Sequence, residues 1–294
     1  MEVGNLNNKE FLEEISKDIK RVPIMLVSQR GWGKSSSLKR IVEHCKRQHP
    51  DMRFKAFDPS TSWYHTAPLR HRQSVTVDRL KQGIIHNLDD TVYEIGSLTK
   101  DQRRLFVSTV IKMDYAVRYN AQITHGSNNN FPWICYIWEE AESYFGSYAL
   151  RSNDPETDVF RDFITIGRNF KMTGFLVATA EVGEISPTLR RRVNKIYGKV
   201  ATNDMAEAKR LDATLPDKLR MLRRFQFIYA GDRIVGPISL DDTCKDIPID
   251  QYIIAPENME NRTIAGYTAQ GWWIRFLGTL AIIVLFIAYF LGNR

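Results

Sequence analysis

The chain has 294 residues, enough for one large α/β domain and a short additional segment. Apolar residues make up 43% and charged residues 26%, a balance that excludes disorder over most of the length. The net charge of +7 favours polyanionic partners, either nucleic acid or an anionic membrane face. The three cysteines include no CxxC pair, which excludes a disulfide framework and indicates a reducing compartment.

Residues 1–21 are predicted to be a helical lead-in. The opening segment MEVGNLNNKEFLEEISKDIK is polar and acidic, whereas a secretory signal peptide is basic and then apolar. We therefore expect no export through the N-terminus.

A glycine-containing turn follows the first predicted strand, Val22–Val27. The turn matches the Walker A pattern GxxxxGK[ST], except that serine stands at the first position. Its glycines let backbone N–H groups surround phosphate, its lysine neutralises the β and γ oxygens, and the next hydroxyl ligates Mg²⁺. We therefore predict an ATP–Mg²⁺ site formed by Ser28, Gln29, Arg30, Gly31, Trp32, Gly33, Lys34, Ser35 and Ser36.

The region after this loop is predicted to contain two short strands, Arg53–Phe57 and Ser74–Asp78, and an amphipathic helix, Leu98–Tyr119. A strand at Pro132–Trp138 follows and ends in an acidic turn.

The acidic turn supplies two adjacent carboxylates. In P-loop ATPases, a strand adjacent to the phosphate-loop strand carries an acid that holds Mg²⁺, and the next acid polarises the attacking water. We predict Glu139 as the metal acid, together with Ser35, and Glu140 as the catalytic base; Glu139 departs from the usual Asp. The alternative is an acidic helix N-terminus, which explains Glu140 and Glu142 without catalysis.

The pattern downstream alternates between helix and strand. A helix is predicted from Asp154 to Ile166, strands at Gly174–Thr179 and Lys195–Val200, and a hairpin around Gly231-Asp232. The predicted fold class is α/β: a P-loop, RecA/ASCE-like domain over 22–240. It has a largely parallel sheet, helices on both faces and the nucleotide at the carboxyl ends of the strands.

The C-terminal segment is strongly apolar. No side chain from Phe276 to Asn293 is charged, and a helix over Trp272–Gly292 spans roughly 30 Å, the thickness of a hydrocarbon core. We predict a linker at 241–271 and a transmembrane tail anchor at 272–292, with the ATPase domain on the cytoplasmic or virion-interior side. A buried core helix, or one docked on a partner, is the alternative.

Three segments resemble motifs of the FtsK–HerA superfamily of DNA-pumping ATPases. They read RGWGKS, WEEAESYF and GRNFKMTGFLVATAEVGEIS, and the similarity covers Val22 to Leu240. The resemblance implies a homo-oligomeric ring, usually hexameric, with a neighbour's arginine completing each site. Arg168, at the family's "GR" position, is the first candidate for this finger and Arg161 the second, although either fits a solvated helix residue. Where the family carries a polar sensor, typically Gln, this chain has Ala180, next to Thr179.

The predicted function is a membrane-tethered, ATP-driven translocase of double-stranded DNA or another nucleic acid. The architecture resembles the genome-packaging ATPases of membrane-containing viruses, which implies packaging or virion membrane proteins as further partners. One alternative is a filamentous-phage-type assembly ATPase, similar to zonula occludens toxin, and another is a slowly hydrolysing NTP-binding membrane scaffold. The basic run Arg190–Arg192 is predicted either to contact DNA phosphates or to cap a helix.

Overall fold

The computed structural model describes residues 3–63, 66, 69, 71–82, 89–127, 130–146, 155–178, 185–240 and 253–254, with no side-chain description for 3–7, 202–203 and 253–254. The strands of this described part are β1 (Ile24–Val27), β2 (Arg53–Asp58), β3 (His71–Ser74), β4 (Thr91–Glu94), β5 (Ile134–Trp138), β6 (Met172–Ala178), β7 (Asn194–Tyr197), β8 (Gln226–Ala230), β9 (Ile234–Ser239) and β10 (Ile253–Ile254).

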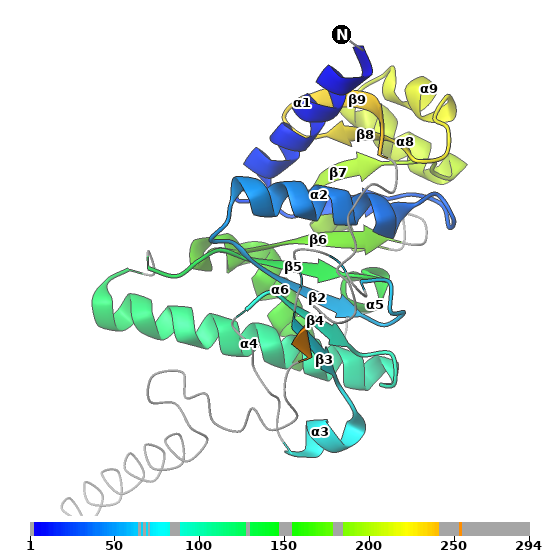
Figure 1. Ribbon diagram of the computed structural model, residues 1–294. Coiled ribbons are helices and arrows are strands. Elements are labelled where there is room, and N and C mark those ends of the chain that lie inside the picture. The colour runs from blue at the N-terminus through cyan, green and yellow to red at the C-terminus, as the bar shows by residue number, and fades with distance from the viewer. Residues whose placement is uncertain are drawn as a thin grey trace, which may run out of the picture. The chain divides into compact units, whose positions relative to one another are not determined.

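The described strands form one sheet in the order β10-β3-β4-β2-β5-β6-β1-β7-β8-β9 (Figure 1). Neighbours from β10 to β7 pair in parallel, whereas β7–β8 and β8–β9 are antiparallel. The predicted largely parallel sheet and the terminal hairpin are thus confirmed. One expectation was wrong: β6 lies between β1 and β5, so the strand with the acidic turn is not adjacent to the phosphate-loop strand.

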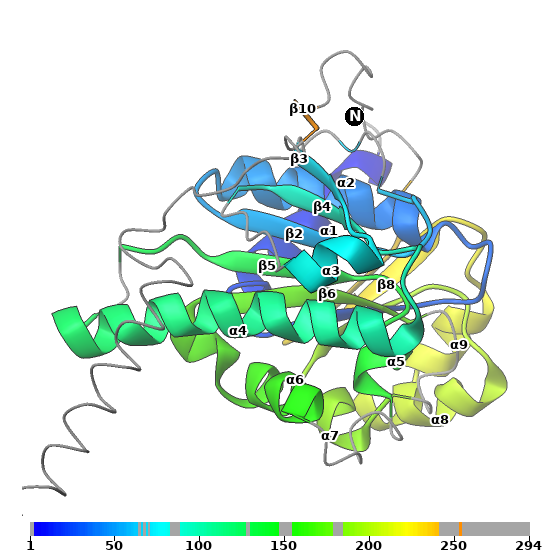
Figure 2. The ribbon, with the colours of Figure 1, turned by 90° about the horizontal axis from the view of Figure 1, so that it is seen from below.

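The described helices are α1 (Val3–Asp18), α2 (Lys34–Gln48), α3 (Val77–Gln82), α4 (Lys100–His125), α5 (Glu142–Phe145), α6 (Pro155–Ile166), α7 (Pro187–Arg190), α8 (Thr202–Leu211) and α9 (Leu215–Arg220), with a 3₁₀ turn, η1, at Gly167–Phe170. In Figure 2, α1 and α2 lie on one side of the sheet, and α4 and α6 lie on the other.

The two faces of the sheet pack into two separate hydrophobic cores. On β1, Ile24 and Leu26 join the core beneath α1 and α2, whereas Met25 and Val27 join the core beneath α4 and α6. This alternation follows from the two-residue period of a strand, and because both faces are covered, β1 is apolar throughout. The predicted placement of helices on both faces is therefore confirmed.

The segment Ser74–Asp78 differs from its prediction as a strand. Strand β3 ends at Ser74, opposite Glu94, the last residue of its partner β4, and helix α3 begins at Val77. The side chain of Thr76 accepts a hydrogen bond from the Arg79 backbone N–H at 3.4 Å, in the manner of a helix N-cap. The strand therefore stops where its partner stops, although the sequence continues with β-branched residues.

The N-terminal helix is tied to the antiparallel edge of the sheet by one buried carboxylate. Asp18, the last residue of α1, accepts hydrogen bonds from the Tyr229 hydroxyl of β8 at 2.6 Å and from the Asn194 amide of β7 at 3.1 Å. Phe11 and Ile15 of the same helix are fully buried. Helix α1 is thus packed onto the sheet as an integral part of this core.

The predicted tail anchor, and the membrane localisation inferred from it, are contradicted. None of the helices in the described ranges combines the length and the apolar character needed to cross a bilayer. Helix α4, with 26 residues, is long enough at roughly 40 Å, but it carries charged side chains along its length. The segment 272–292 itself falls in the unit Ala255–Arg294, outside the described residues, as does most of the predicted linker 241–271.

A buried ion pair attaches α4 to the sheet. The Lys55 ammonium on β2 is fully buried and lies 2.7 and 2.9 Å from the two carboxylate oxygens of Asp114 on α4. The Tyr136 hydroxyl on β5 donates to the same carboxylate at 2.6 Å. Burial lowers the pKa of Lys55, and the charge of Asp114 opposes that shift. The pair is therefore two desolvated charges, each of which needs the other.

We expect Asp114→Ala to lower the free energy of unfolding by about 3–5 kcal/mol, because it leaves the Lys55 ammonium buried without its carboxylate. Urea denaturation of the full-length protein measures the loss. Asp101→Ala, an exposed acid in the first turn of the same helix, is the control and should change the stability little. A loss below about 1 kcal/mol for Asp114→Ala would contradict the assignment.

Candidate nucleotide-binding site

The predicted phosphate loop runs from the end of β1 to the start of α2. Gly31 and Gly33 have φ angles of 79° and 80°, the left-handed conformation that only glycine adopts without strain. The loop after β7 supports it from behind: the carbonyl oxygen of Lys199 accepts hydrogen bonds from the Gln29 backbone N–H at 2.7 Å and from the Ser28 hydroxyl at 3.3 Å.

Serine at the first position of the Walker A pattern is accommodated by a glycine on the neighbouring strand loop. A Cβ atom on Gly198 would lie 2.4 Å from the Ser28 hydroxyl oxygen, closer than any real contact allows. The space that the pattern usually obtains from a glycine at position 28 is therefore provided by Gly198. Ser28 is a departure from the pattern that preserves the shape of the loop.

Lys34 is buried inside the loop, at the first residue of α2. Its ammonium donates hydrogen bonds to the backbone carbonyls of Ser28 at 2.7 Å and Gln29 at 3.0 Å. Burial lowers its pKa, and the carboxylates of Glu139 and Glu142 oppose that shift. A partly desolvated cation among backbone N–H groups at a helix N-terminus is an arrangement suited to phosphate.

The other predicted loop residues lie at the surface of this turn. Gln29, Arg30 and Gly31 are exposed, and Trp32, Ser35 and Ser36 are half-buried. The Lys199 ammonium lies 5.9 Å from the centre of the Trp32 ring. The structure thus brings the predicted loop residues into one continuous turn in front of α2.

Glu139, at the end of β5, points into the same region. Its side chain is buried and accepts a hydrogen bond from the Trp63 indole N–H at 2.8 Å. Burial raises the pKa of Glu139, and the side chains of Trp63 and the nearby Ser35 oppose the shift. The structure therefore joins the two predicted metal ligands, Ser35 and Glu139, beside Lys34.

This oxygen pair fits Mg²⁺, which prefers hard oxygen donors and completes its shell with waters and substrate phosphates. Among the described residues, no group of three or more His, Cys, Asp or Glu side chains is arranged to hold a metal ion. The pair Ser35–Glu139 would therefore hold Mg²⁺ together with a nucleotide.

Glu140 is separated from Glu139 by its backbone conformation. Its φ angle is 53°, in the left-handed region, and its side chain is 45% exposed. One carboxylate oxygen lies 3.7 Å from a guanidinium nitrogen of Arg103 on α4. Strained residues of this kind concentrate at functional sites. The two adjacent acids thus occupy different environments, one buried against Ser35 and one open to solvent.

Sequence reasoning missed Trp63, Arg103 and Gly198. Trp63 meets its partner Glu139 across 76 positions of the chain, and nothing in its local sequence indicates that pairing. Gly198 could have been found, because it is a glycine at the carboxyl end of a predicted parallel strand, where ligand-binding loops lie.

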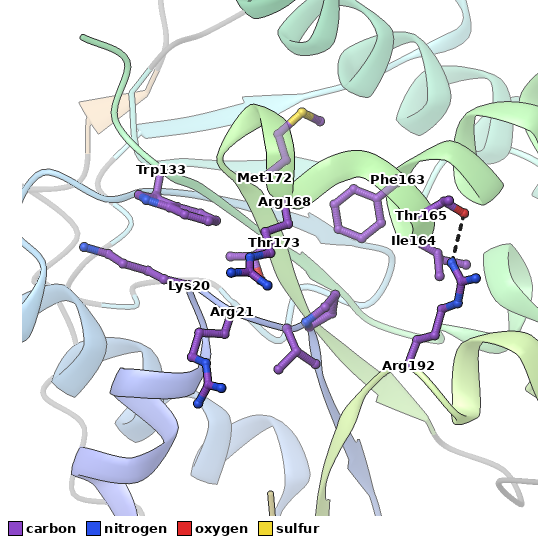
Figure 3. A pocket seen from close by; sticks show the side chains of 12 residues that line it. Lys20, Arg21, Trp133, Phe163, Ile164, Thr165, Arg168, Met172, Thr173 and Arg192 are labelled. Atoms are coloured by element: carbon purple, nitrogen blue, oxygen red, sulfur yellow. Dashed lines mark hydrogen bonds between the residues drawn. The ribbon is translucent and has the colours of Figure 1, made fainter. Parts of the chain in front are cut away.

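The predicted arginine finger lies at the amino edge of the sheet, which is formed by the amino ends of the parallel strands and is opposite to the phosphate loop. Arg168 on η1 is exposed and lines a cavity of about 130 Å³ at the amino ends of β1, β5 and β6, together with Lys20, Arg21 and Arg192 (Figure 3). Because β6 has seven residues, roughly 20 Å separates this edge from the phosphate loop. Arg168 is therefore too far away to act on its own chain's loop.

Three of the other predicted basic residues, Arg161, Arg190 and Arg192, have partners of their own. Arg161 pairs with Asp158 at 3.2 Å on the surface of α6, and Arg190 pairs with Glu207 at 2.8 Å. Arg192 donates to the Thr165 hydroxyl at 3.3 Å, as Figure 3 shows. The sensor positions Thr179 and Ala180 lie outside the described residues.

The raised pKa of Glu139 predicts a pH-dependent stability. The folded protein holds the Glu139 proton more tightly than the unfolded chain does, so ionisation destabilises the fold as the pH rises above about 4.3. We expect Glu139→Gln to be more stable than the parent protein at pH 7 without nucleotide, with an advantage that shrinks towards pH 4. Urea denaturation between these pH values measures the difference, with exposed Glu13→Gln as control. An advantage independent of pH would contradict the prediction.

No protein-family model matches the chain, and no curated protein sequence does. Solved structures do match. The genome-packaging NTPase B204 of Sulfolobus turreted icosahedral virus 2, in complex with ATP-gammaS, aligns with a TM-score of 0.51 and 14% identity over 74% of this chain and 98% of that one. The DNA-packaging ATPase B204 of Sulfolobus turreted icosahedral virus gives 0.50 and 13% over 74% and 98%.

A secretion ATPase is similar to the same extent. The cytoplasmic domain of the type VII secretion ATPase EccC of Thermomonospora curvata aligns with a TM-score of 0.51 and 15% identity, over 74% of this chain but 25% of that one. The resemblance expected from the motifs is thus confirmed at the level of the fold. This chain has the P-loop NTPase fold that viral genome-packaging NTPases and a secretion ATPase share.

Proposed function

We propose that this chain is an ATPase that translocates double-stranded DNA, with viral genome packaging as its role. The observation that carries the proposal is the group at the carboxyl edge of the sheet: Lys34 inside the phosphate loop, with Ser35 and the buried Glu139 beside it. A phosphate-binding cation next to paired oxygen ligands is the arrangement that ATP hydrolysis requires.

In this proposal each residue has a separate task. Mg²⁺, when bound, supplies charge neutralisation of the β and γ phosphates, and Ser35 and Glu139 would hold it. Lys34 leaves the carbonyls of its own loop for the phosphate oxygens. Glu140, partly exposed and adjacent to the metal acid, orients the attacking water and accepts its proton. The Trp63 indole fixes the Glu139 carboxylate from the buried side.

The translocation step rests on resemblance and on charge. The packaging NTPase from the turreted icosahedral virus aligns over 98% of its length, so nearly the whole fold of that protein has a counterpart in this chain. The net charge of +7 suits a DNA substrate. The similar secretion ATPase acts in a type VII system, which makes a protein substrate the second candidate.

We further propose a homo-oligomeric ring in which Arg168 of one subunit completes the phosphate site of the next. The cavity at the amino edge supports this assignment, because its exposed cations Arg21, Arg168 and Arg192 lie at the opposite ends of the strands from their own phosphate loop. An arginine that stabilises the charge of the γ-phosphoryl group in trans accelerates hydrolysis strongly.

The first test is ATP turnover by the full-length protein with and without double-stranded DNA. We expect DNA to raise turnover, an effect that weakens as salt increases. Lys34→Ala should lower turnover by about 100-fold or more, because the cation at the phosphates is lost. Lys39→Ala, on the same helix, is the matched control. Turnover that ignores both DNA and Lys34→Ala would refute the motor, and turnover that responds only to Lys34→Ala would favour a protein substrate.

The second test mixes two inactive variants. Arg168→Ala lacks the donated arginine and Glu140→Gln lacks the base, so each should be slow alone. If the arginine acts in trans, equal mixing restores interfaces that contain one intact group of each kind, about a quarter of them. Steady-state turnover of the mixture should recover accordingly. A mixture no faster than its components would show that Arg168 does not act across subunits.

A further inference from the structure

Two aromatic side chains lie at the phosphate loop, one within it and one packed against it, and each has a cation over its ring. Trp32 belongs to the loop itself and has the Lys199 ammonium 5.9 Å from its ring centre. Phe225 comes from the segment between α9 and β8, and the Arg224 guanidinium carbon lies 4.9 Å from the centre of its ring. Neither aromatic has a task in binding phosphate.

Phe225 is held in an unfavourable backbone conformation. Its φ angle is 63°, in the left-handed region that bulky side chains avoid. Its carbonyl accepts a hydrogen bond from the Leu240 N–H at 2.9 Å, and the backbone N–H of Arg223 donates to the Gln226 side chain at 2.8 Å. These bonds on both sides impose the conformation. Backbone strain that the surroundings impose in this way is concentrated at functional sites.

The imposed conformation puts the Phe225 ring against the phosphate loop. A Cβ atom on Gly33 would lie 2.2 Å from Cε1 of this ring, so the ring is in direct contact with the glycine. The Ser37 hydroxyl, in the first turn of α2, donates to the carbonyl of Leu240 at 3.3 Å. The segment that carries Phe225 is thus attached to the helix N-terminus where phosphate would bind.

A nucleotide anchored by its phosphates must extend its base along the side of the loop. An aromatic ring in contact with the last glycine of that loop offers a stacking surface beside the phosphate site, and stacking accepts a base by its π face. Arg224 is exposed, and its side chain makes no hydrogen bond or ion pair within the described part of the chain. It is therefore free to leave the ring.

We propose that Phe225 is the nucleobase platform of this site: the base stacks on the ring face that Arg224 covers. This inference rests on the proposed nucleotide site and adds to it a residue for the base, separate from those for the phosphates. It predicts that loss of the ring weakens binding of a nucleotide but not of its phosphate portion alone.

The test compares binding of ADP with binding of pyrophosphate, each with Mg²⁺, to the full-length protein by calorimetry. Phe225→Ala should raise the Kd for ADP by about ten-fold, the value of one base–aromatic stack, and leave the Kd for pyrophosphate unchanged. Phe225→Trp should restore ADP binding. Phe131→Ala removes an aromatic ring that also lies under an arginine, Arg118, but at the amino edge, and is the matched control.

Each outcome separates the platform from the phosphate site. If Phe225→Ala weakens ADP and pyrophosphate equally, the ring only supports the loop and the proposal fails. If Phe225→Ala changes the binding of neither ligand, the base lies elsewhere. The same holds if Trp32→Ala, rather than Phe225→Ala, selectively weakens the binding of ADP. If the parent protein binds neither ligand, the nucleotide site itself is refuted. If Lys34→Ala abolishes the binding of both ligands while Phe225→Ala changes the binding of neither, the phosphate site is supported and the base platform is refuted.

Discussion

The pairing of β1 and β5 with the strand between them is the constraint on which the candidate site depends. Val27 at the end of β1 pairs with Ala178 of β6, and Trp138 at the end of β5 pairs with Leu176 of the same strand. The phosphate loop and the acidic turn therefore leave the sheet at the same edge and at nearly the same level. The Ala141 N–H donates to a carbonyl of β6 at 2.9 Å, which folds the acidic turn over that strand. A slip of one residue would exchange the two faces of β5 and remove Glu139 from Ser35.

Two opposite charges are desolvated side by side at this edge. Burial lowers the pKa of Lys34 and raises that of Glu139, so each ionised group is less stable here than in water. Neither forms a direct ion pair with the other in the described structure; Lys34 bonds to backbone carbonyls and Glu139 to the Trp63 indole. These buried charges therefore make the fold less stable than an apolar core of the same shape would. A ligand that pairs with them recovers part of that lost free energy when it binds.

The predictions that succeeded rest on local patterns. The glycine turn between β1 and α2, the β5 strand and the hairpin at Gly231-Asp232 each have their signal within about ten residues, where periodicity and turn chemistry act. The strand predicted at Ser74–Asp78 failed because its length depends on a partner, β4, that is distant in sequence. Phe225 and Trp63 were unpredictable for the same reason, since their roles arise from contacts across the sheet. The membrane anchor was inferred from apolar length alone, in a segment that lies outside the described residues, and no helix in the described ranges could cross a bilayer.

The bond between Asp18 and Tyr229 joins residues 211 positions apart. Helix α1 precedes β8 along the chain and is therefore synthesised before it, so its carboxylate obtains this partner only when β8 has been made. Until then the apolar side chains of Phe11 and Ile15 lack the part of their core that β8 and β9 supply. Contacts of this sequence separation slow folding, and exposed apolar surface favours aggregation. Helix α1 can therefore complete its packing only after the hairpin β8–β9 has been synthesised. Chains that stop before β8 cannot complete this core.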